Sequence, residues 1–244
     1  MIKKSKFEVK SLNKIIDSKQ ILKNISFIIE PEEHLVIIGS SGAGKSMLAK
    51  CIIGLEDISS GSIFFNGKLI SGNAERKKVL NKLGVCFQSN ALFDSYNTWQ
   101  NIAFKRLYNE KSPNVFKLKK LAIERLKEVG LPTNIAEYYP SELSGGMQKR
   151  VGIARSLFSD PDILIFDEPT TGLDPIISKK IVSLISKITN ASKKTAITIT
   201  HDIKLAMILA SKIILIDDGK VEWSGSPKQA MLSKNKLLKI FLND

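Results

Sequence analysis

The first third of the chain alternates short apolar runs with polar turns, which is the pattern of β-strands. We expect strands over residues 7–12 and 21–30, separated by the polar residues 17–20. Residues 35–38 form a short apolar run that leads into a glycine, which indicates a buried strand. Residues 44–54 then carry apolar side chains at helical spacing and predict the first helix.

The middle of the chain changes from strand-like to helical spacing. Strand-like runs occur at residues 62–65 and 84–87, and residues 97–158 follow with a helical character. The clearest helical face in this stretch consists of Leu118, Leu121, Ala122, Leu126 and Val129. Gly130 and Pro132 end that helix. The pattern therefore predicts a helical insertion in a sheet-based domain.

The last third returns to an alternation of strands and helices. The expected order is a strand at 163–166, a helix at 174–190, a strand at 195–200, a helix at 203–210 and a strand at 213–216. Asp218 and Gly219 are typical of a hairpin turn, which would lead into a strand at 221–223. Because strands that alternate with helices form mostly parallel sheets covered by helices, we expect an α/β fold.

Length and composition fit a globular protein. The 244 residues are 43% hydrophobic and 25% charged, which excludes a disordered or fibrous chain and suffices for one large domain or two small ones. Two cysteines, Cys51 and Cys86, argue against a disulfide scaffold and suit a reducing compartment. Residues 1–10 lack the apolar stretch of a secretory signal, and polar residues interrupt the longest apolar candidate at 203–216. We therefore expect this chain alone not to cross a membrane.

The chain is strongly basic. Its net charge of +13, from 37 basic and 24 acidic residues, would suit a nucleic acid or an anionic membrane surface. Only five of the basic residues are arginine, and the lysines are spread along the chain. Since nucleic-acid readers depend on arginine for bidentate contacts, the charge favours a lysine-rich composition over a dedicated basic surface.

Residues 39–46 read GSSGAGKS and fit the phosphate-binding pattern G-x-x-x-x-G-K-[ST] between a strand and a helix. The glycines let backbone N–H groups point at phosphate oxygens, and the helix N-terminus adds a positive dipole end. Lys45 can reach the β- and γ-phosphates, and the Ser46 hydroxyl can ligate Mg²⁺. The phosphate loop consists of Gly39, Ser40, Ser41, Gly42, Ala43, Gly44, Lys45 and Ser46.

Two acids follow the apolar run at 163–166. Because ligand sites lie at the carboxyl ends of parallel strands, Asp167 is a candidate to hold Mg²⁺ and Glu168 to polarise an attacking water. These features predict a nucleoside-triphosphate hydrolase or transferase and leave a kinase, a GTPase and a transport ATPase open. The GTPase hypothesis lacks support because the sequence has no N-K-x-D element.

A second anion cradle is predicted at residues 143–148, LSGGMQ, where Ser144, Gly145 and Gly146 begin a helix. It lies about a hundred residues beyond the phosphate loop. If the two half-sites do not converge within one subunit, each needs a partner, and a head-to-tail pair of chains with two-fold symmetry provides it.

Together, these motifs resemble those of the ATP-binding subunits of ABC transporters. The resemblance covers nearly the whole chain, and the motifs occur in the same order as in the family. GSSGAGKS resembles the Walker A loop, ILIFDE resembles Walker B, and LSGGM resembles the ABC signature. Gln88 matches the Q-loop, residues 171–174 with Asp174 match the D-loop, and His201 matches the H-loop. The resemblance implies that Gln88 contacts Mg²⁺ and the water, that His201 contacts the γ-phosphate, and that Asp174 belongs to the nucleotide-binding set.

The resemblance also implies a fold and a set of partners. The chain would form one ABC ATPase domain over 1–244, with a RecA-like P-loop NTPase core, including an N-terminal antiparallel β subdomain, at 1–88 and 160–244. An α-helical signature subdomain would be inserted at 89–159. ATP and Mg²⁺ would be the cofactors, and two copies would bind two ATP molecules. Membrane permease subunits would bind near 89–104, whose aromatic residues are Phe93, Tyr96, Trp99 and Phe104.

One position departs from the family. Members usually carry an aromatic residue that stacks on adenine, and here that position falls on Ile15 or Ile16. An aliphatic contact would still cover the base, but with less specificity.

Within the family, residues 84–104 and 139–157 resemble the ATPases of Mla-type phospholipid transporters, which have an MCE-domain lipid-binding subunit. The ALFDS element at 91–95 and Met147 carry this likeness, and residues 167–176 fit it. It implies a phospholipid cargo, an MCE-domain partner and a place at the cytoplasmic face of the inner membrane. An ABC transporter of another solute is the alternative. A soluble ABC ATPase that acts on nucleic acid or ribosomes is disfavoured, because such proteins usually carry two cassettes or a long coiled-coil insertion, and we expect no direct nucleic-acid contact.

Overall fold

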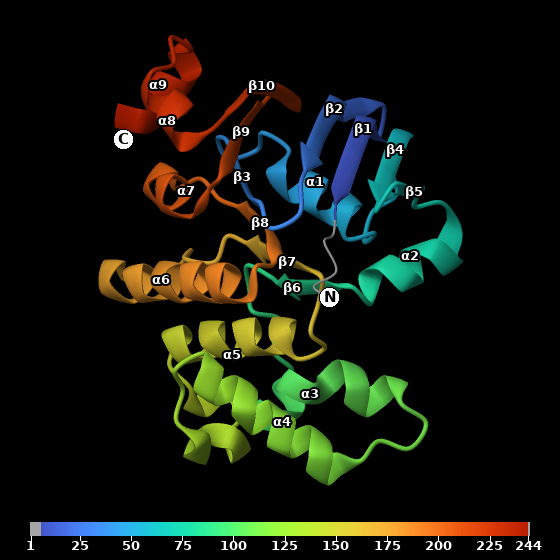
Figure 1. Ribbon diagram of the computed structural model, residues 1–244, viewed down its shortest axis with the longest axis vertical. Coiled ribbons are helices and arrows are strands. Elements are labelled where there is room, and N and C mark those ends of the chain that lie inside the picture. The colour runs from blue at the N-terminus through green and yellow to red at the C-terminus, as the bar shows by residue number, and fades with distance from the viewer. Residues whose placement is uncertain (1–5, 244) are drawn as a thin grey trace.

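The computed structural model describes residues 6–243, which form two β-sheets with helices packed against them (Figure 1). The first sheet is antiparallel and has the order β2-β1-β4-β5. Its strands are β1 (Phe7–Ile16), β2 (Lys19–Ile29), β4 (Ser60–Phe65) and β5 (Lys68–Leu69). This sheet is the expected antiparallel β part of the fold.

The second sheet has the order β10-β9-β3-β8-β7-β6 and is parallel except for its edge strand β10. Its strands are β3 (His34–Ile38), β6 (Leu83–Cys86), β7 (Ile163–Asp167), β8 (Thr195–Ile199), β9 (Lys212–Asp217) and β10 (Lys220–Gly225). The predicted hairpin is confirmed: Asp218 and Gly219 have φ values of 43° and 73° and join β9 to β10. The α/β fold with a mostly parallel sheet is confirmed as well.

The helices cover both faces of this sheet and extend the molecule at its two ends (Figure 1). Helices α3, α4 and α5 lie together at the end opposite α8 and α9, and they follow β6 in the chain. The helices are α1 (Lys45–Ile52), α2 (Gly72–Leu80), α3 (Thr98–Asn109), α4 (Val115–Glu128), α5 (Gly145–Leu157), α6 (Pro175–Ser192), α7 (Ile203–Leu209), α8 (Pro227–Met231) and α9 (Lys236–Asn243). Two 3₁₀ turns, Thr133–Glu137 and Pro140–Glu142, connect α4 to α5.

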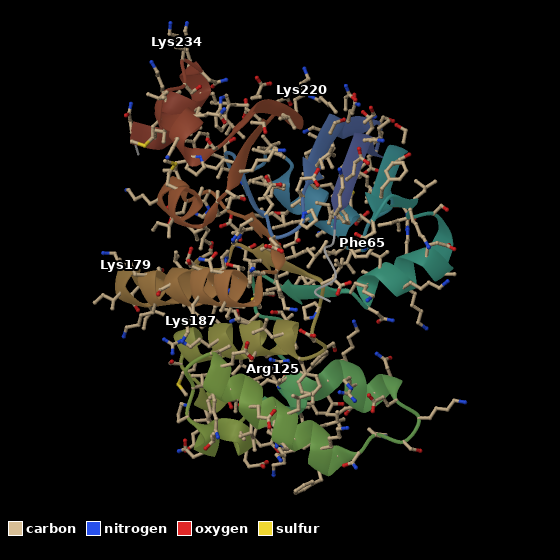
Figure 2. The ribbon with its side chains drawn as sticks, in the orientation of Figure 1. Phe65, Arg125, Lys179, Lys187, Lys220 and Lys234 are labelled. Atoms are coloured by element: carbon tan, nitrogen blue, oxygen red, sulfur yellow. The ribbon has the colours of Figure 1, made fainter. Side chains whose placement is uncertain are left out.

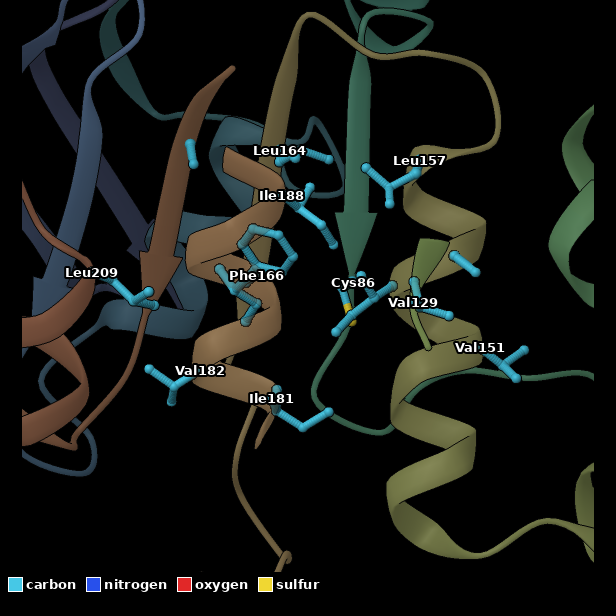
Figure 3. Packing of buried hydrophobic residues seen from close by; sticks show 14 of the residues in the cluster. Cys86, Val129, Val151, Leu157, Leu164, Phe166, Ile181, Val182, Ile188 and Leu209 are labelled. Atoms are coloured by element: carbon cyan, nitrogen blue, oxygen red, sulfur yellow. The ribbon is translucent and has the colours of Figure 1, made fainter. Parts of the chain in front are cut away.

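Strand β3 shows why the parallel strands are continuous apolar runs in the sequence: both of its faces are buried. Leu35 and Ile37 pack into a core shared with the first sheet and α1, whereas Val36 and Ile38 belong to the core on the other face. Figure 3 shows this second core, where β6 and β7 meet α5 and α6. Leu35 pairs with Ile197 of β8 on one side and with Lys212 of β9 on the other, so β3 lies in the middle of the sheet.

Some elements differ from the sequence-based expectation. β1 extends to Ile16, beyond the expected end at residue 12. Its second half was not predicted, because an irregular register at Ser11, with φ of 47°, interrupts the alternation of apolar and polar residues. The expected helix at 174–190 begins at Pro175 with Asp174 as its N-cap. Helices α2, α8 and α9 were not predicted. α2 and α8 are short and have little apolar character. α9 carries a clear apolar face, with Leu237, Leu238 and Phe241 against the core, but it is only eight residues long.

Basic side chains project from several separate elements in Figure 2. Among the residues labelled in Figure 2, Lys179 and Lys187 project from α6, Lys220 begins β10 and Lys234 lies between α8 and α9. This distribution agrees with a lysine-rich composition. Of the helices within residues 6–243, none combines the length and the apolar character needed to cross a bilayer.

Candidate functional site

A pocket of about 540 Å³ opens where the parallel strands of the second sheet end. The phosphate loop follows β3, Gln88 follows β6, Glu168 follows β7 and His201 follows β8, so neighbouring strands bring distant parts of the chain together. The residues that line the pocket are Ser41, Gly42, Gly44, Lys45, Ser46, Met47, Gln88, Glu168 and His201. Met47 is the one lining residue that the sequence did not indicate.

The phosphate loop curls around the buried side chain of Lys45. Its ammonium donates hydrogen bonds to the carbonyl oxygens of Gly39 and Ser40 at 2.8 and 2.9 Å. Gly39 must be glycine, because a Cβ at this position would lie 2.2 Å from the carbonyl oxygen of Ile216. Gly44 has φ of 103° and precedes α1 without a side-chain cap, so the helix begins with backbone groups alone.

Burial lowers the pKa of Lys45, and the carboxylates of Glu168 and Asp167 act in the opposite direction. A cation with little hydration, held at the start of α1, favours the binding of an anion in this pocket. The loop geometry and the charge therefore suit the phosphates of a nucleotide.

Glu168 is buried and held from several directions. Its backbone is left-handed with φ of 46°, and its N–H donates to the carbonyl oxygen of Ile199 at 2.9 Å. Its carboxylate accepts a hydrogen bond from the hydroxyl of Thr171 at 3.1 Å and lies 3.0 Å from Nδ1 of His201. The strained backbone and the fixed carboxylate place one acid at a defined point of the pocket wall.

Asp167 has a buried oxygen, Oδ1, without a hydrogen-bond partner in the described part of the chain. Burial and the neighbouring Glu168 carboxylate raise the pKa of Asp167, and Lys149 opposes them. Ser46 and Gln88 line the pocket, whereas Asp167 precedes the lining residue Glu168. The hydroxyl, amide and carboxylate oxygens of these three residues are the hard ligands that suit Mg²⁺. Residues 6–243 contain no cluster of three or more His, Cys, Asp or Glu side chains able to hold a metal.

The other predicted nucleotide contacts lie outside this pocket. Ser144 is exposed and caps α5 by accepting a hydrogen bond from the N–H of Met147 at 3.3 Å. Asp174 is exposed and caps α6. The two caps belong to one surface: a Cβ on Gly146 would lie 2.8 Å from Cγ2 of Ile177, in the first turn of α6. Within one chain, this surface lies apart from the lining of the pocket.

The expected position of the adenine contact also lies outside the pocket lining. Ile15 and Ile16 end β1, and Ile15 is half exposed at the tip of the first hairpin. Among the described residues that line the pocket there is no Phe, Tyr or Trp.

Sequence reasoning also missed Lys149. This side chain on α5 is 2% exposed, and its ammonium donates to the carbonyl oxygen of Gln88 at 2.8 Å. The sequence gives no signal of this burial, because a lysine beside the apolar residues of α5 predicts a solvated side chain.

Comparisons with known proteins agree with the site. A family model described as ABC transporter matches residues 22–171. The chain is 38% identical over 229 residues to the glutamine transport ATP-binding protein GlnQ of Escherichia coli, covering 93% of each. It is 35% identical over 237 residues to the intermembrane phospholipid transport ATP-binding protein MlaF of Haemophilus influenzae, covering 96% of this chain and 89% of that protein.

Among solved structures, the dimeric ATP-binding cassette MJ0796 bound to ADP and Pi is similar, with a TM-score of 0.82 and 30% identity. The match covers 91% of this chain and 98% of that cassette. That structure represents a post-hydrolysis state, and the pocket around Lys45 and Glu168 suits the same reaction. The chain therefore belongs to the ABC transporter family of ATP-binding subunits, whose members bind and hydrolyse ATP.

Proposed function

We propose that this chain drives an ABC transporter by hydrolysing ATP with Glu168 as the general base. The observation that carries this assignment is the meeting of Glu168, His201 and the phosphate loop in one pocket. A buried carboxylate held by fixed partners is suited to polarise a water and take its proton. His201, which is largely exposed, keeps the carboxylate oriented and contacts the γ-phosphate when ATP is bound.

In the same proposal, Lys45 leaves the carbonyls of Gly39 and Ser40 and contacts the β- and γ-phosphates. The backbone N–H groups at the start of α1 hold the remaining phosphate oxygens. Ser46, Gln88 and Asp167 would hold Mg²⁺, and the unpartnered Oδ1 of Asp167 supports this assignment. When bound, the ion neutralises the charge of the phosphates.

A second copy of the chain completes the site. Ser144, Gly145, Gly146 and Asp174 lie outside the pocket of their own subunit, so we assign them to the nucleotide held by the partner copy. The similarity to a dimeric cassette structure supports a head-to-tail pair. Closure of the pair of chains on bound ATP, and opening of the pair after hydrolysis, would move the helices of the membrane permease subunits.

The membrane permease subunits bind beside α3. An apolar groove of about 330 Å³ lies there, and its lining includes Phe87, Phe93, Ile102 and Phe104. Phe93 stacks on Phe104 with a centroid distance of 4.1 Å, and Tyr96 and Tyr108 extend this cluster. Of the aromatic residues predicted for this contact, Trp99 is instead buried in the helical core.

This contact would hold the chain at the cytoplasmic face of the inner membrane. In the same proposal, residues 89–159 form the helical signature subdomain, and residues 1–88 and 160–244 form the core.

For the cargo we propose phospholipid, moved by a transporter with an MCE-domain subunit. The likeness to the Mla-type ATPases at residues 84–104 and 139–157, and the relative MlaF, support this assignment. A second candidate is an amino acid, which the likeness to GlnQ favours. The residues of the nucleotide pocket would act identically with either cargo, because only the permease meets it.

Purification from native membranes tests the proposal. The tagged Glu168→Gln chain, extracted in mild detergent with Mg·ATP, should retain a permease because the ATP-bound state persists. An MCE-domain protein with bound phospholipid in the same complex would support the lipid cargo. A permease with a soluble solute receptor would replace that cargo with a polar solute. Ribosomes or nucleic acid without a membrane protein would contradict the transporter proposal itself.

A further inference from the structure

Two cations on α5 hold the segment that follows β6, residues 88–91. Lys149 donates to the carbonyl oxygen of Gln88 at 2.8 Å. The guanidinium of Arg155 donates to the carbonyl oxygens of Asn90 and Ala91 at 2.5 and 2.6 Å. One helix therefore contacts most of the carbonyl groups of this short segment.

The segment has an unfavourable backbone conformation. Asn90 and Ala91 are both left-handed, with φ values of 60° and 46°, and alanine rarely adopts this region. Such a conformation persists only where the surroundings hold it. The helix lies close enough to do so, because a Cβ on Gly152 would contact Cys86 Sγ at 3.6 Å and Asn90 Cα at 3.9 Å. Figure 3 shows Cys86 at the end of β6 beside α5.

Packing alone does not require a charged side chain at position 149. Burial lowers the pKa of Lys149, which the Cys86 thiol and the carboxylates of Asp167 and Glu168 oppose. A buried ammonium costs desolvation free energy, and an apolar side chain of similar length would fill the same space without that cost. What only the ammonium supplies is a directed hydrogen bond to Gln88 and a positive charge behind the two acids.

We propose that Lys149 is a positioning residue that fixes Gln88 in the nucleotide pocket and transmits movements of α5 to it. Lys149 lies in the second turn of the helix that Ser144 caps, so a displacement of this cap by the partner's nucleotide would move the Gln88 carbonyl with it. The inference rests on the proposed function, because it assumes that Gln88 acts on the nucleotide and Ser144 on that of the partner copy.

Amide hydrogen exchange of the nucleotide-free chain tests the contact without ATP hydrolysis. The reporter is the N–H of Asn90, which donates to the carbonyl oxygen of Phe87 at 3.1 Å. In Lys149→Met, we expect exchange over residues 87–92 to accelerate roughly tenfold, because a charge-assisted hydrogen bond is lost. Exchange in α5 and β7 and the melting temperature should stay close to those of the wild type. Lys149→Arg should restore the wild-type rate.

The matched control is Arg150→Met, which removes a neighbouring cation that donates to the carbonyl oxygen of Gly130 instead. It should leave exchange over residues 87–92 unchanged. Unchanged exchange in Lys149→Met, or faster exchange throughout α5 and β7, would overturn the proposal. If Lys149→Met fails to fold, Lys149→Leu provides the same comparison.

Steady-state ATP hydrolysis gives a second readout. Lys149→Met should lower kcat and leave KM for ATP near the wild-type value, and Lys149→Arg should recover kcat. An increase in KM with unchanged kcat would contradict a role in positioning Gln88. If the wild-type chain does not hydrolyse ATP, the proposed function fails, whereas the exchange experiment still decides the contact of Lys149.

Discussion

The carboxylate of Glu168 and Nδ1 of His201 lie 3.0 Å apart, although 33 positions separate the two residues in the chain. Strands β7 and β8 are parallel neighbours, so the residues that follow them emerge at the same edge of the sheet. The pair therefore depends on the register of two strands and not on a local sequence motif.

Glu168→Gln should abolish turnover and leave nucleotide binding intact. The amide preserves the size of the side chain and one acceptor oxygen but cannot take a proton from water, so we expect kcat to fall by ~10²–10⁴. ATPase assays and equilibrium binding of a fluorescent ATP analogue measure the two effects. Glu124→Gln, at an exposed position of α4, is the matched control. Wild-type rates in Glu168→Gln would remove this residue from the role of general base.

Lys45→Ala should weaken nucleotide binding itself. The variant removes the buried cation that the loop holds through the carbonyls of Gly39 and Ser40. We expect the Kd for ATP to rise at least tenfold, since the loss of one charge-assisted contact is worth roughly 1.5–3 kcal/mol. Titration calorimetry measures it, with Lys50→Ala, exposed on the same helix, as the control. An unchanged Kd in Lys45→Ala would contradict the phosphate-loop assignment.

His34 should make the fold sensitive to mild acid. Burial lowers its pKa from 6.5 to about 4, and its ring lies 2.8 Å from the hydroxyl of Thr198. Below pH 6.5 the unfolded chain binds a proton that the folded chain does not, so stability falls as the pH decreases toward 4. Between pH 6.5 and 5 the expected loss is about 1.6 kcal/mol, because the slope approaches ~1.4 kcal/mol per pH unit only once the unfolded histidine is fully protonated.

Denaturant unfolding at a series of pH values tests this prediction. His34→Gln keeps a polar group that can hydrogen-bond to the Thr198 hydroxyl but does not titrate, so its stability should change less over the same interval. Equal slopes for the wild type and His34→Gln would show that other groups cause the acid sensitivity.

Gly84→Ala should destabilise the contact between β6 and α5. The added Cβ would lie 2.2 Å from the carbonyl oxygen of Ser156 and 2.7 Å from Cγ of Pro161. Overpacking of this kind costs about 1–3 kcal/mol of unfolding free energy, which thermal and denaturant unfolding can detect. Gly152→Ala is the informative comparison: its Cβ makes only ordinary contacts and alanine favours the helix, so the variant should be neutral or more stable. Equal stability of the two variants would exclude steric overlap as the cause.

The sequence predicted the elements whose pattern is local. The alternation of apolar runs from residue 163 onward indicated the parallel strands, and Asp218-Gly219 indicated the hairpin. The residues that line the pocket were also predicted, apart from Met47, because each follows the end of a strand or belongs to a spaced motif. The second half of β1 was missed, since a bulge at Ser11 hides its period.

Contacts that depend on the distance between elements could not be predicted. Lys149 is a polar residue on a helix, and only the approach of α5 to β6 reveals that it is buried against Gln88. Trp99 belongs to the same aromatic segment as Phe93 and Phe104, but its position on α3 turns it into the core. In both cases the packing of helices decides the role, and a single sequence contains no measure of it.

The central place of β3 determines when the nucleotide site can form during synthesis. This strand carries the phosphate loop, yet it pairs with β8 and β9, which the ribosome produces more than 150 residues later. Until then both hydrogen-bonding edges of β3 lack their native partners, which favours association with other nascent chains. A chain truncated before residue 195 should therefore aggregate and bind no ATP, although it contains the complete phosphate loop, Gln88, Glu168 and the LSGGM segment.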